Sequence, residues 1–202
     1  VFQNPLTTKN DLEPIKRGSL STLAYVKEAI GLIKEKLSVP LIGFAGAPFT
    51  VASYMIEGGS SKTLAKTKFW LLSETESFHE LMELLTEKTI EYLHMQADAG
   101  VDAIQIFDTW AGALSNSQFN EHSLPYLKKI IASVSKKVPV LLFSKAATAF
   151  TDEFKESGAS GIAFDIHADM AKQRKRLPTM VLQGNLDPDV LLSSPEIVKK
   201  EA

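Results

Sequence analysis

Side chains that could do chemistry come directly after short apolar runs of this sequence. Asp108, Thr109 and Trp110 follow one run, and Lys145 lies just beyond another. A lysine that is partly desolvated there could form a Schiff base with a carbonyl substrate, whereas a lysine on the rim would only hold a salt bridge. Of the four histidines only His167 comes just after such a run, and a lone histidine is weak support for catalysis.

Composition excludes several kinds of chemistry. Cys is absent, which removes disulfides, thiolate-bound zinc, iron–sulfur clusters and thiol nucleophiles. No His pair has metal-ligand spacing with a third ligand nearby, so we expect no metal site. Arg17, Arg174 and Arg176 do not directly follow an apolar run, so bidentate recognition of carboxylates is missing from the visible site.

Charge and hydropathy exclude two classes of partner. Lys and Arg total 22 against 24 for Asp and Glu, which gives a formal charge of -2. This chain lacks the basic excess that nucleic acid binding requires, so no nucleic acid partner is expected. No apolar stretch approaches the roughly 20 residues of a membrane span, so no membrane partner is expected either.

Five short apolar runs predict buried strands, because apolar residues occupy both faces of each run, as in covered parallel sheets. These strands are predicted over 39–45, 103–107, 138–143, 161–164 and 179–182. Helical periodicity predicts helices over 23–37, 73–100, 123–137 and 151–157. Ser73 and Glu76 have capping-box spacing, and Ser123 is the predicted N-cap of its helix. The stretches 5–18 and 58–62 are predicted to be loops, the second of them mobile.

Alternating strands and helices favour either a doubly wound sheet or a closed (β/α)8 TIM barrel, and five strands cannot close an eight-stranded barrel. No linker marks a second domain, so residues 1–202 are expected to form a single domain. Since the chain opens at Val1 rather than Met and stops within a charged helix, we expect that domain to be incomplete. Ligands of both folds bind at the carboxyl ends of the strands. There, aromatic rings could form a flat wall or simply pack in the core. Phenylalanines at or near these ends are Phe44, Phe107, Phe143 and Phe164.

Three ordered motif regions resemble the uroporphyrinogen decarboxylase family. They comprise VPLIGFAGAPFT at 39–50 with SYMIEGGS at 53–60, QIFDTWAG at 105–112 with LPY at 124–126, and LQGNLDP at 182–188. The resemblance spans nearly the whole chain. It implies a single-domain (β/α)8 TIM barrel, usually a homodimer, of which this chain holds about five of the eight βα units, the third through the seventh.

The same resemblance implies a reaction and its site residues. The family removes the carboxyl groups of the four acetate side chains of uroporphyrinogen III, giving coproporphyrinogen III in haem and chlorophyll synthesis. No metal or organic cofactor is expected, because a protonated pyrrole ring of the substrate serves as the electron sink. Tyr54 is similar to the tyrosine that hydrogen-bonds substrate, and Thr109 stands where the family usually has a substrate-binding serine. Phe44 and Phe107 would belong to the apolar wall, and Asp165 would be structural.

The resemblance assigns no catalytic residue to this chain. The family's catalytic aspartate, arginine cluster and late histidine are expected on segments before Val1 and after Ala202, so the chain alone is expected to be inactive. Loop detail departs from the family at Ala146–Ala147, where glycine is common, and at Ile166–His167, where an aromatic residue is usual. We expect a cytoplasmic location, or a plastid in a photosynthetic eukaryote.

Three other interpretations stay open. A methyltransferase of the same barrel superfamily would normally use Cys at a zinc site, and this chain has none. A lyase that works through a Schiff base at Lys145 is the second alternative. The third is non-enzymatic: a truncated barrel that survives only by pairing with another chain or with further segments.

Overall fold

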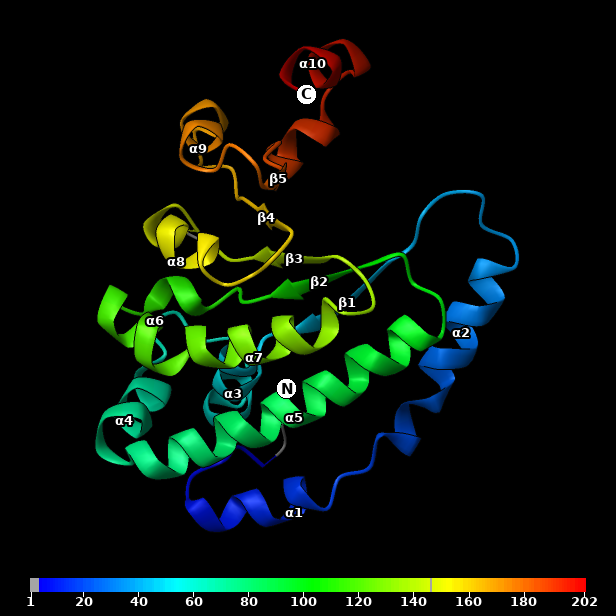
Figure 1. Cartoon of the computed structure of the whole chain (residues 1–202). Helices are drawn as coiled ribbons and strands as arrows, with labels where there is room; N and C mark the ends of the chain where they lie inside the picture. The colour runs from blue at the N-terminus through cyan, green and yellow to red at the C-terminus, as the bar shows by residue number, and fades with distance from the viewer. Residues whose placement is uncertain (1–3, 146) are drawn as a thin grey trace.

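Strands and helices alternate along the chain (Figure 1). The computed structural model describes residues 4–145 and 147–202. The strands are β1 Ile42–Gly46, β2 Ala103–Phe107, β3 Val140–Phe143, β4 Gly161–Ala163 and β5 Val181–Gln183. The helices are α1 Glu13–Lys16, α2 Ala24–Lys34, α3 Pro48–Glu57, α4 Ala65–Ser73, α5 Thr75–Asp98, α6 Asn116–His122, α7 Leu124–Val134, α8 Thr151–Lys155, α9 Met170–Arg176 and α10 Pro195–Glu201.

The five strands form one parallel sheet in the order β1-β2-β3-β4-β5. Each of the five predicted strands is present, and its carboxyl end differs from the prediction by no more than one residue. Neighbouring strands in sequence are neighbours in space, as consecutive βα units with helical crossovers require. All the carboxyl ends therefore lie along one edge of the sheet, on the left in Figure 1.

The two faces of the sheet differ in their cover. Partners in register share a face, so Ala45 and Ile106 lie on one side and Phe44 and Gln105 on the other. The first side is buried under α5 and α7, which pack together along the sheet (Figure 1). On the second side Phe44 is 63% exposed, and Ile42 and Val181 are exposed as well. The prediction that the strands are covered on both faces is therefore wrong for these residues, because five parallel strands leave the inner face open.

Helix starts show where local sequence rules fail. The predicted capping box is wrong, because Ser73 is the last residue of α4 and Glu74 precedes the first residue of α5. Ser123 does precede α7 as predicted, but its side chain makes no capping bond there. Its hydroxyl donates instead to Asp108, so a tertiary contact replaces the local one.

The two predicted loops have different outcomes. Residues 5–18 contain a short 3-10 turn and α1, so they are not simply a loop. The carboxylate of Asp11 accepts the backbone N–H groups of Thr7 and Thr8, which fixes the start of that turn. After α3, Gly58 takes a left-handed conformation with φ 84° and ends the helix, as the predicted loop requires. Within the described residues, no helix is both long and apolar enough to cross a bilayer.

The backbone of Phe44 is held by a buried side chain from α5. Phe44 donates its N–H to Gln96 Oε1 at 3.0 Å, and Gln96 Nε2 donates to the Phe44 carbonyl at 2.9 Å. β1 has a single strand neighbour, β2, so this amide supplies pairing that a further strand does not. Gly43 makes room for it, since a Cβ there would lie 2.6 Å from Gln96 Oε1.

Replacing Gln96 by methionine is expected to lower the free energy of unfolding by about 1–3 kcal/mol, because two partly buried backbone groups lose their partners. Urea unfolding followed by circular dichroism measures this loss. The matched control is Glu87→Met, an exposed position on the same helix, where the change should stay within about 0.5 kcal/mol. Equal midpoints for the two variants would show that Phe44 does not depend on the amide.

Candidate functional site

A buried carboxyl group ties together the elements at the carboxyl end of β2. Asp108 is fully buried, and its backbone N–H donates to the carbonyl of Phe143 at 2.8 Å. The hydroxyl of Thr50 donates to Asp108 Oδ1 at 2.9 Å, and the hydroxyl of Ser123 donates to Oδ2 at 2.6 Å. Since Thr50 lies on α3, after β1, and Ser123 precedes α7, after β2, this one side chain joins β2 to a helix of the preceding βα unit and to a helix of its own.

The same network positions the turn that carries Thr109. Trp110 donates its backbone N–H to the hydroxyl oxygen of Thr50 at 3.1 Å. Thr109 is partly buried and lies between Asp108 and Trp110, both of which are held by Thr50. Burial raises the pKa of Asp108 to about 6, and the hydrogen bonds from Ser123 and Thr50 oppose that rise.

Aromatic rings from three adjacent strands contact one another at the open face. The rings of Phe44 and Phe107 lie 6.0 Å apart edge to face, and those of Phe107 and Phe143 lie 5.5 Å apart. We call Phe44, Phe107 and Phe143 the ring row. Such edge-to-face pairs are favourable arrangements of aromatic side chains. The two phenylalanines predicted to line the substrate wall are thus in direct contact.

Tyr54 belongs to a second aromatic group around Trp110. Its ring centroid lies 6.0 Å from that of Trp110, and Lys145 Nζ lies 5.6 Å from the Trp110 centroid. Lys145 is exposed, so the desolvation that would favour a Schiff-base lysine is not provided by this geometry. The ammonium group of Lys145 instead makes a cation–π contact with Trp110.

The predicted substrate residues do not line a single described hollow. One hollow of about 340 Å³ at β1 is lined by Phe44, Val51 and Tyr92 among others. A larger hollow of about 660 Å³ opens at the carboxyl ends of β3, β4 and β5, where Lys145 and His167 are among its lining residues. Tyr54, Thr109 and Phe107 line neither of them. The structure therefore brings Phe44 to Phe107 and Tyr54 to Trp110 without enclosing all four predicted residues.

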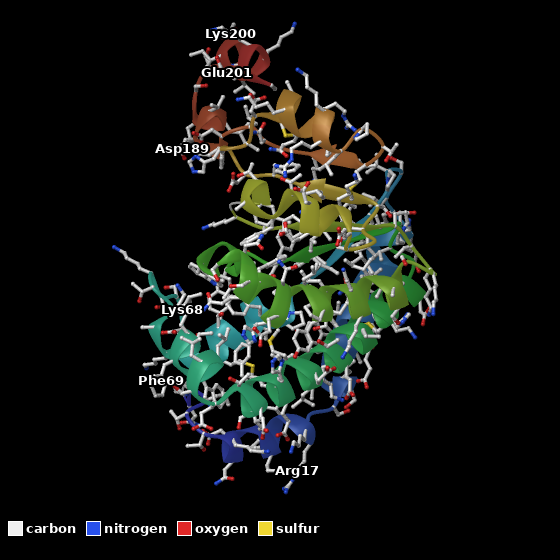
Figure 2. All side chains as sticks on the ribbon, turned by 60° about the vertical axis from the view of Figure 1, so that its left-hand side comes forward. Arg17, Lys68, Phe69, Asp189, Lys200 and Glu201 are labelled. Atoms are coloured by element: carbon white, nitrogen blue, oxygen red, sulfur yellow. The ribbon has the colours of Figure 1, made fainter. Side chains whose placement is uncertain are left out.

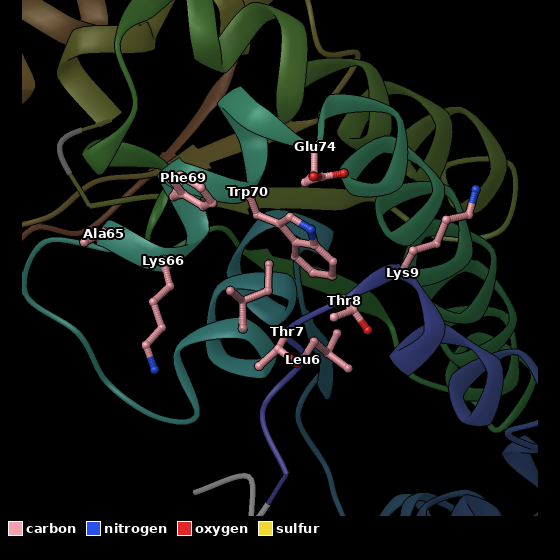
Figure 3. Close-up of a pocket in the computed structure, with 10 residues that line it drawn as sticks. Leu6, Thr7, Thr8, Lys9, Ala65, Lys66, Phe69, Trp70 and Glu74 are labelled. Atoms are coloured by element: carbon pink, nitrogen blue, oxygen red, sulfur yellow. The ribbon is translucent and has the colours of Figure 1, made fainter.

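A third hollow, of about 570 Å³, lies between the N-terminal segment, the end of α3 and α4. Figure 3 shows the ring of Trp70 in its middle, with Leu6 and Thr8 on one side and Phe69 on the other. No strand residue and no predicted substrate residue lines this hollow. Ligands of parallel α/β folds meet the carboxyl ends of strands, so we place the candidate site at the ring row instead.

The arginines are engaged away from the ring row. Arg174 Nη1 donates to the backbone carbonyl oxygens of Leu177 and Met180, and Arg176 pairs with Asp152 at 3.0 Å. Figure 2 shows Arg17 at the opposite end of the molecule from Asp189, a residue of the 660 Å³ hollow. The described arginines thus offer no bidentate partner for a carboxylate at the ring row, as predicted.

Asp165 and His167 lie in one turn after β4. Asp165 Oδ1 accepts a hydrogen bond from the backbone N–H of His167 at 3.0 Å, and the backbone carbonyl of Asp165 accepts one from Asn185 Nδ2 at 3.1 Å. These bonds give Asp165 a structural task, while the exposed His167 lines the larger hollow. Of the residues that depart from the family pattern after Lys145, Ala146 lies outside the described residues and Ala147 is buried.

Asp108→Asn is expected to change how stability depends on pH. Because the pKa of Asp108 is raised from 3.8 to about 6, the folded state binds this proton more tightly than the unfolded state does. The stability that this carboxyl group contributes is full below pH 4, falls by about 3 kcal/mol between pH 4 and 6, and is constant above. The difference in unfolding free energy between wild type and variant should fall by that amount over the same range.

The matched control for this pH series is Asp169→Asn. Hydrogen bonds from Lys172 lower the pKa of the exposed Asp169, so the stability of this group is present above pH 4 and is lost as pH falls. The wild-type advantage over Asp169→Asn should therefore grow with pH, opposite in sign to Asp108→Asn. A pH-independent difference for Asp108→Asn would show that this carboxyl group does not titrate in the range.

Comparison with known proteins places the chain in a family. The family model described as Uroporphyrinogen decarboxylase (URO-D) matches residues 1–202. The uroporphyrinogen decarboxylase of Protochlamydia amoebophila is 41% identical over 203 residues, covering 100% of this chain and 56% of that protein. The one from Desulfotalea psychrophila is 42% identical, covering 99% of this chain and 60% of the relative. The chain thus spans 56–60% of the length of these two relatives.

A solved structure supports the architecture. A methyltransferase from Methanosarcina mazei superposes with a TM-score of 0.77 at 24% identity, over 87% of this chain and 52% of that one. At this identity the likeness shows the fold alone, and it agrees with the predicted partial (β/α)8 barrel. The family match covers every described strand. The chain belongs to the uroporphyrinogen decarboxylase family.

Proposed function

We propose that this chain forms part of the substrate site of a uroporphyrinogen decarboxylase. The reaction would convert the four acetate side chains of uroporphyrinogen III to the methyl groups of coproporphyrinogen III, without a cofactor. The match to the family over residues 1–202 is the observation that carries this proposal. Relatives near 40% identity are named as this decarboxylase, so neither the methyltransferase nor the Schiff-base alternative is favoured.

The ring row would supply the apolar wall of the site. In each step a pyrrole ring carbon accepts a proton, and the bond between the methylene carbon and the carboxylate then breaks. The electron pair of that bond flows into the cationic ring as carbon dioxide leaves. A proton added to the methylene carbon then completes the methyl group, and the ring carbon gives up the proton that it had accepted, which restores the pyrrole. Phe44, Phe107 and Phe143 present rings at the open face, where they can exclude water from a flat macrocycle.

Tyr54 and Thr109 would supply hydroxyl donors to the substrate. Tyr54 is partly buried on α3 and contacts Trp110, the residue after Thr109. Since the Asp108 network fixes that turn, the Thr109 hydroxyl would be held in place before substrate arrives. We assign no catalytic residue among those described, and the anionic substrate would need cationic partners beyond this ring row.

The domain and its assembly belong to the same proposal. Residues 1–202 would form one incomplete TIM-barrel domain, whose open face carries Ile42, Phe44 and Val181. Three further strands would bury these side chains and close the barrel. The family resemblance supports a homodimer, and the bacterial origin of the relatives supports a cytoplasmic location over a plastid.

A chimaera tests the proposed substrate site. These 202 residues would replace the matching segment of the Protochlamydia amoebophila relative, and product would be measured as coproporphyrinogen by chromatography. The chimaera should be active, while the 202-residue chain alone should form no product. Tyr54→Phe in the chimaera should lower kcat/KM about 10- to 100-fold, as expected for one lost hydrogen bond to a charged group.

The control for that substitution is Tyr25→Phe, at an exposed position on α2, which should leave kcat/KM unchanged. An inactive but folded chimaera would count against the decarboxylase assignment. An active chimaera in which Tyr54→Phe behaves like Tyr25→Phe would instead remove Tyr54 from the substrate site while leaving the reaction in place.

A further inference from the structure

Two histidines and a glutamate come together in the helical layer, separate from the ring row. His79 lies near the start of α5, and Glu121 and His122 end α6. One ligand atom from each residue lies within 4.8 Å of the other two. The rings of His79 and His122 have their centroids 5.1 Å apart, and His122 Nε2 lies 3.7 Å from Glu121 Oε2.

His122 is a buried polar side chain whose bonding is incomplete. It is 4% exposed, and its Nδ1 has no hydrogen-bond partner within the described structure. Phe78 packs edge to face against the ring at 5.9 Å, so the imidazole is held in an apolar setting. Buried polar atoms almost always have a partner, and one without a partner points to an ion, a water molecule or a functional role.

His79 is oriented by a neighbour on α7. Its Nδ1 and the hydroxyl of Tyr126 form a short hydrogen bond, which leaves Nε2 as the ring nitrogen for another ligand. The rings of His79 and Tyr126 lie 6.1 Å apart at a small angle. Histidines that bind metals are commonly oriented in this way through their second ring nitrogen.

We propose that His79, Glu121 and His122 bind a divalent transition-metal ion of the zinc class, with water in the remaining position. Two imidazoles and one carboxylate form a known ligand set for Zn²⁺, whereas Mg²⁺ and Ca²⁺ prefer oxygen ligands alone. Ligand atoms of a bound tetrahedral site lie about 3.3 Å apart, so binding draws the three residues together. Glu121, with its side chain 63% exposed, is free to make most of that movement.

A bound ion would link α5 to the junction between α6 and α7. Ser123 directly follows His122 and donates to Asp108, so the metal site lies one residue from the network that fixes Thr109. Its effect is therefore structural support of the turn that carries Thr109 rather than chemistry on a substrate. Sequence spacing did not reveal the site, because His79 and His122 are 43 positions apart in sequence and lie on different helices.

Zinc binding to the chelator-treated 202-residue chain tests this inference. Calorimetric titration with Zn²⁺ should give one equivalent per chain and a higher Tm, and Mg²⁺ should do neither. His79→Ala should abolish the tight equivalent, and Glu121→Gln, at an exposed position, should weaken it. Tyr126→Phe should reduce Zn²⁺ affinity about 10- to 100-fold, because His79 loses the partner that orients it. Substituting cobalt should give the intense visible absorption of a four-coordinate ion.

Two control variants show whether the loss of binding is specific to the proposed ligands. His167→Ala removes an exposed histidine elsewhere, and Tyr92→Phe removes a hydroxyl on the same helix as His79; both should bind Zn²⁺ as wild type does. Loss of binding in His167→Ala, or unchanged binding in folded His79→Ala, would overturn the proposal. So would the lack of saturable Zn²⁺ binding to the wild-type chain.

Discussion

The buried carboxyl group of Asp108 is the interaction on which the candidate site depends. A carboxyl group that is buried away from water must be hydrogen-bonded or neutral. The hydroxyl groups of Thr50 and Ser123 donate to Asp108, and its pKa is raised, so both conditions are met. Because Thr50 and Ser123 belong to helices on either side of β2 in sequence, the bonds also fix how neighbouring βα units meet at their carboxyl ends. Removing one partner would leave the others unsatisfied in an apolar interior.

The open face of the sheet follows from the number of strands. In a closed barrel, inward side chains of opposite strands bury one another, and five parallel strands cannot provide that cover. The outer face meets α5 and α7, so Ile104, Ile106 and Leu142 are fully buried while Phe44 is 63% exposed. Gln96 completes this arrangement at the edge, since it satisfies the Phe44 backbone that β2 does not pair.

The sequence predicts most of the fold because the strands are short, apolar and bounded by turn residues. It misplaces the start of α5, since Ser73 and Glu76 meet the local capping rule while Trp70 and Leu71, both buried, extend α4 up to Ser73. Ser123 shows the same limit, because its hydroxyl is used by Asp108, 15 positions earlier in the chain. Local patterns report which residues favour an element, but not which distant group takes their hydrogen bonds.

In the candidate site too, local sequence patterns predict some residues, while others depend on contacts between distant parts of the chain. Position near the carboxyl end of a strand singles out Phe44 and Phe107, and position after a strand singles out Thr109. The ring contact between the two phenylalanines agrees with this prediction. Gln96 and the group of His79, Glu121 and His122 depend on helix packing, so no short spacing announces them.

The lack of fixed positive charge among the described residues at the ring row limits how they could bind an anionic substrate. A porphyrinogen with eight carboxylates would meet apolar rings and hydroxyl donors at the ring row, while Arg174 and Arg176 are bound to other groups. Lys145 lies against Trp110 at this edge, yet it is exposed and its charge is screened by water. Rings and hydroxyls can shape a pocket and orient a carboxylate, but neutralising several anions needs cations of fixed position. Under the proposed function these residues would therefore form the wall that orients the substrate, and cationic groups other than these would supply the binding energy for its charges.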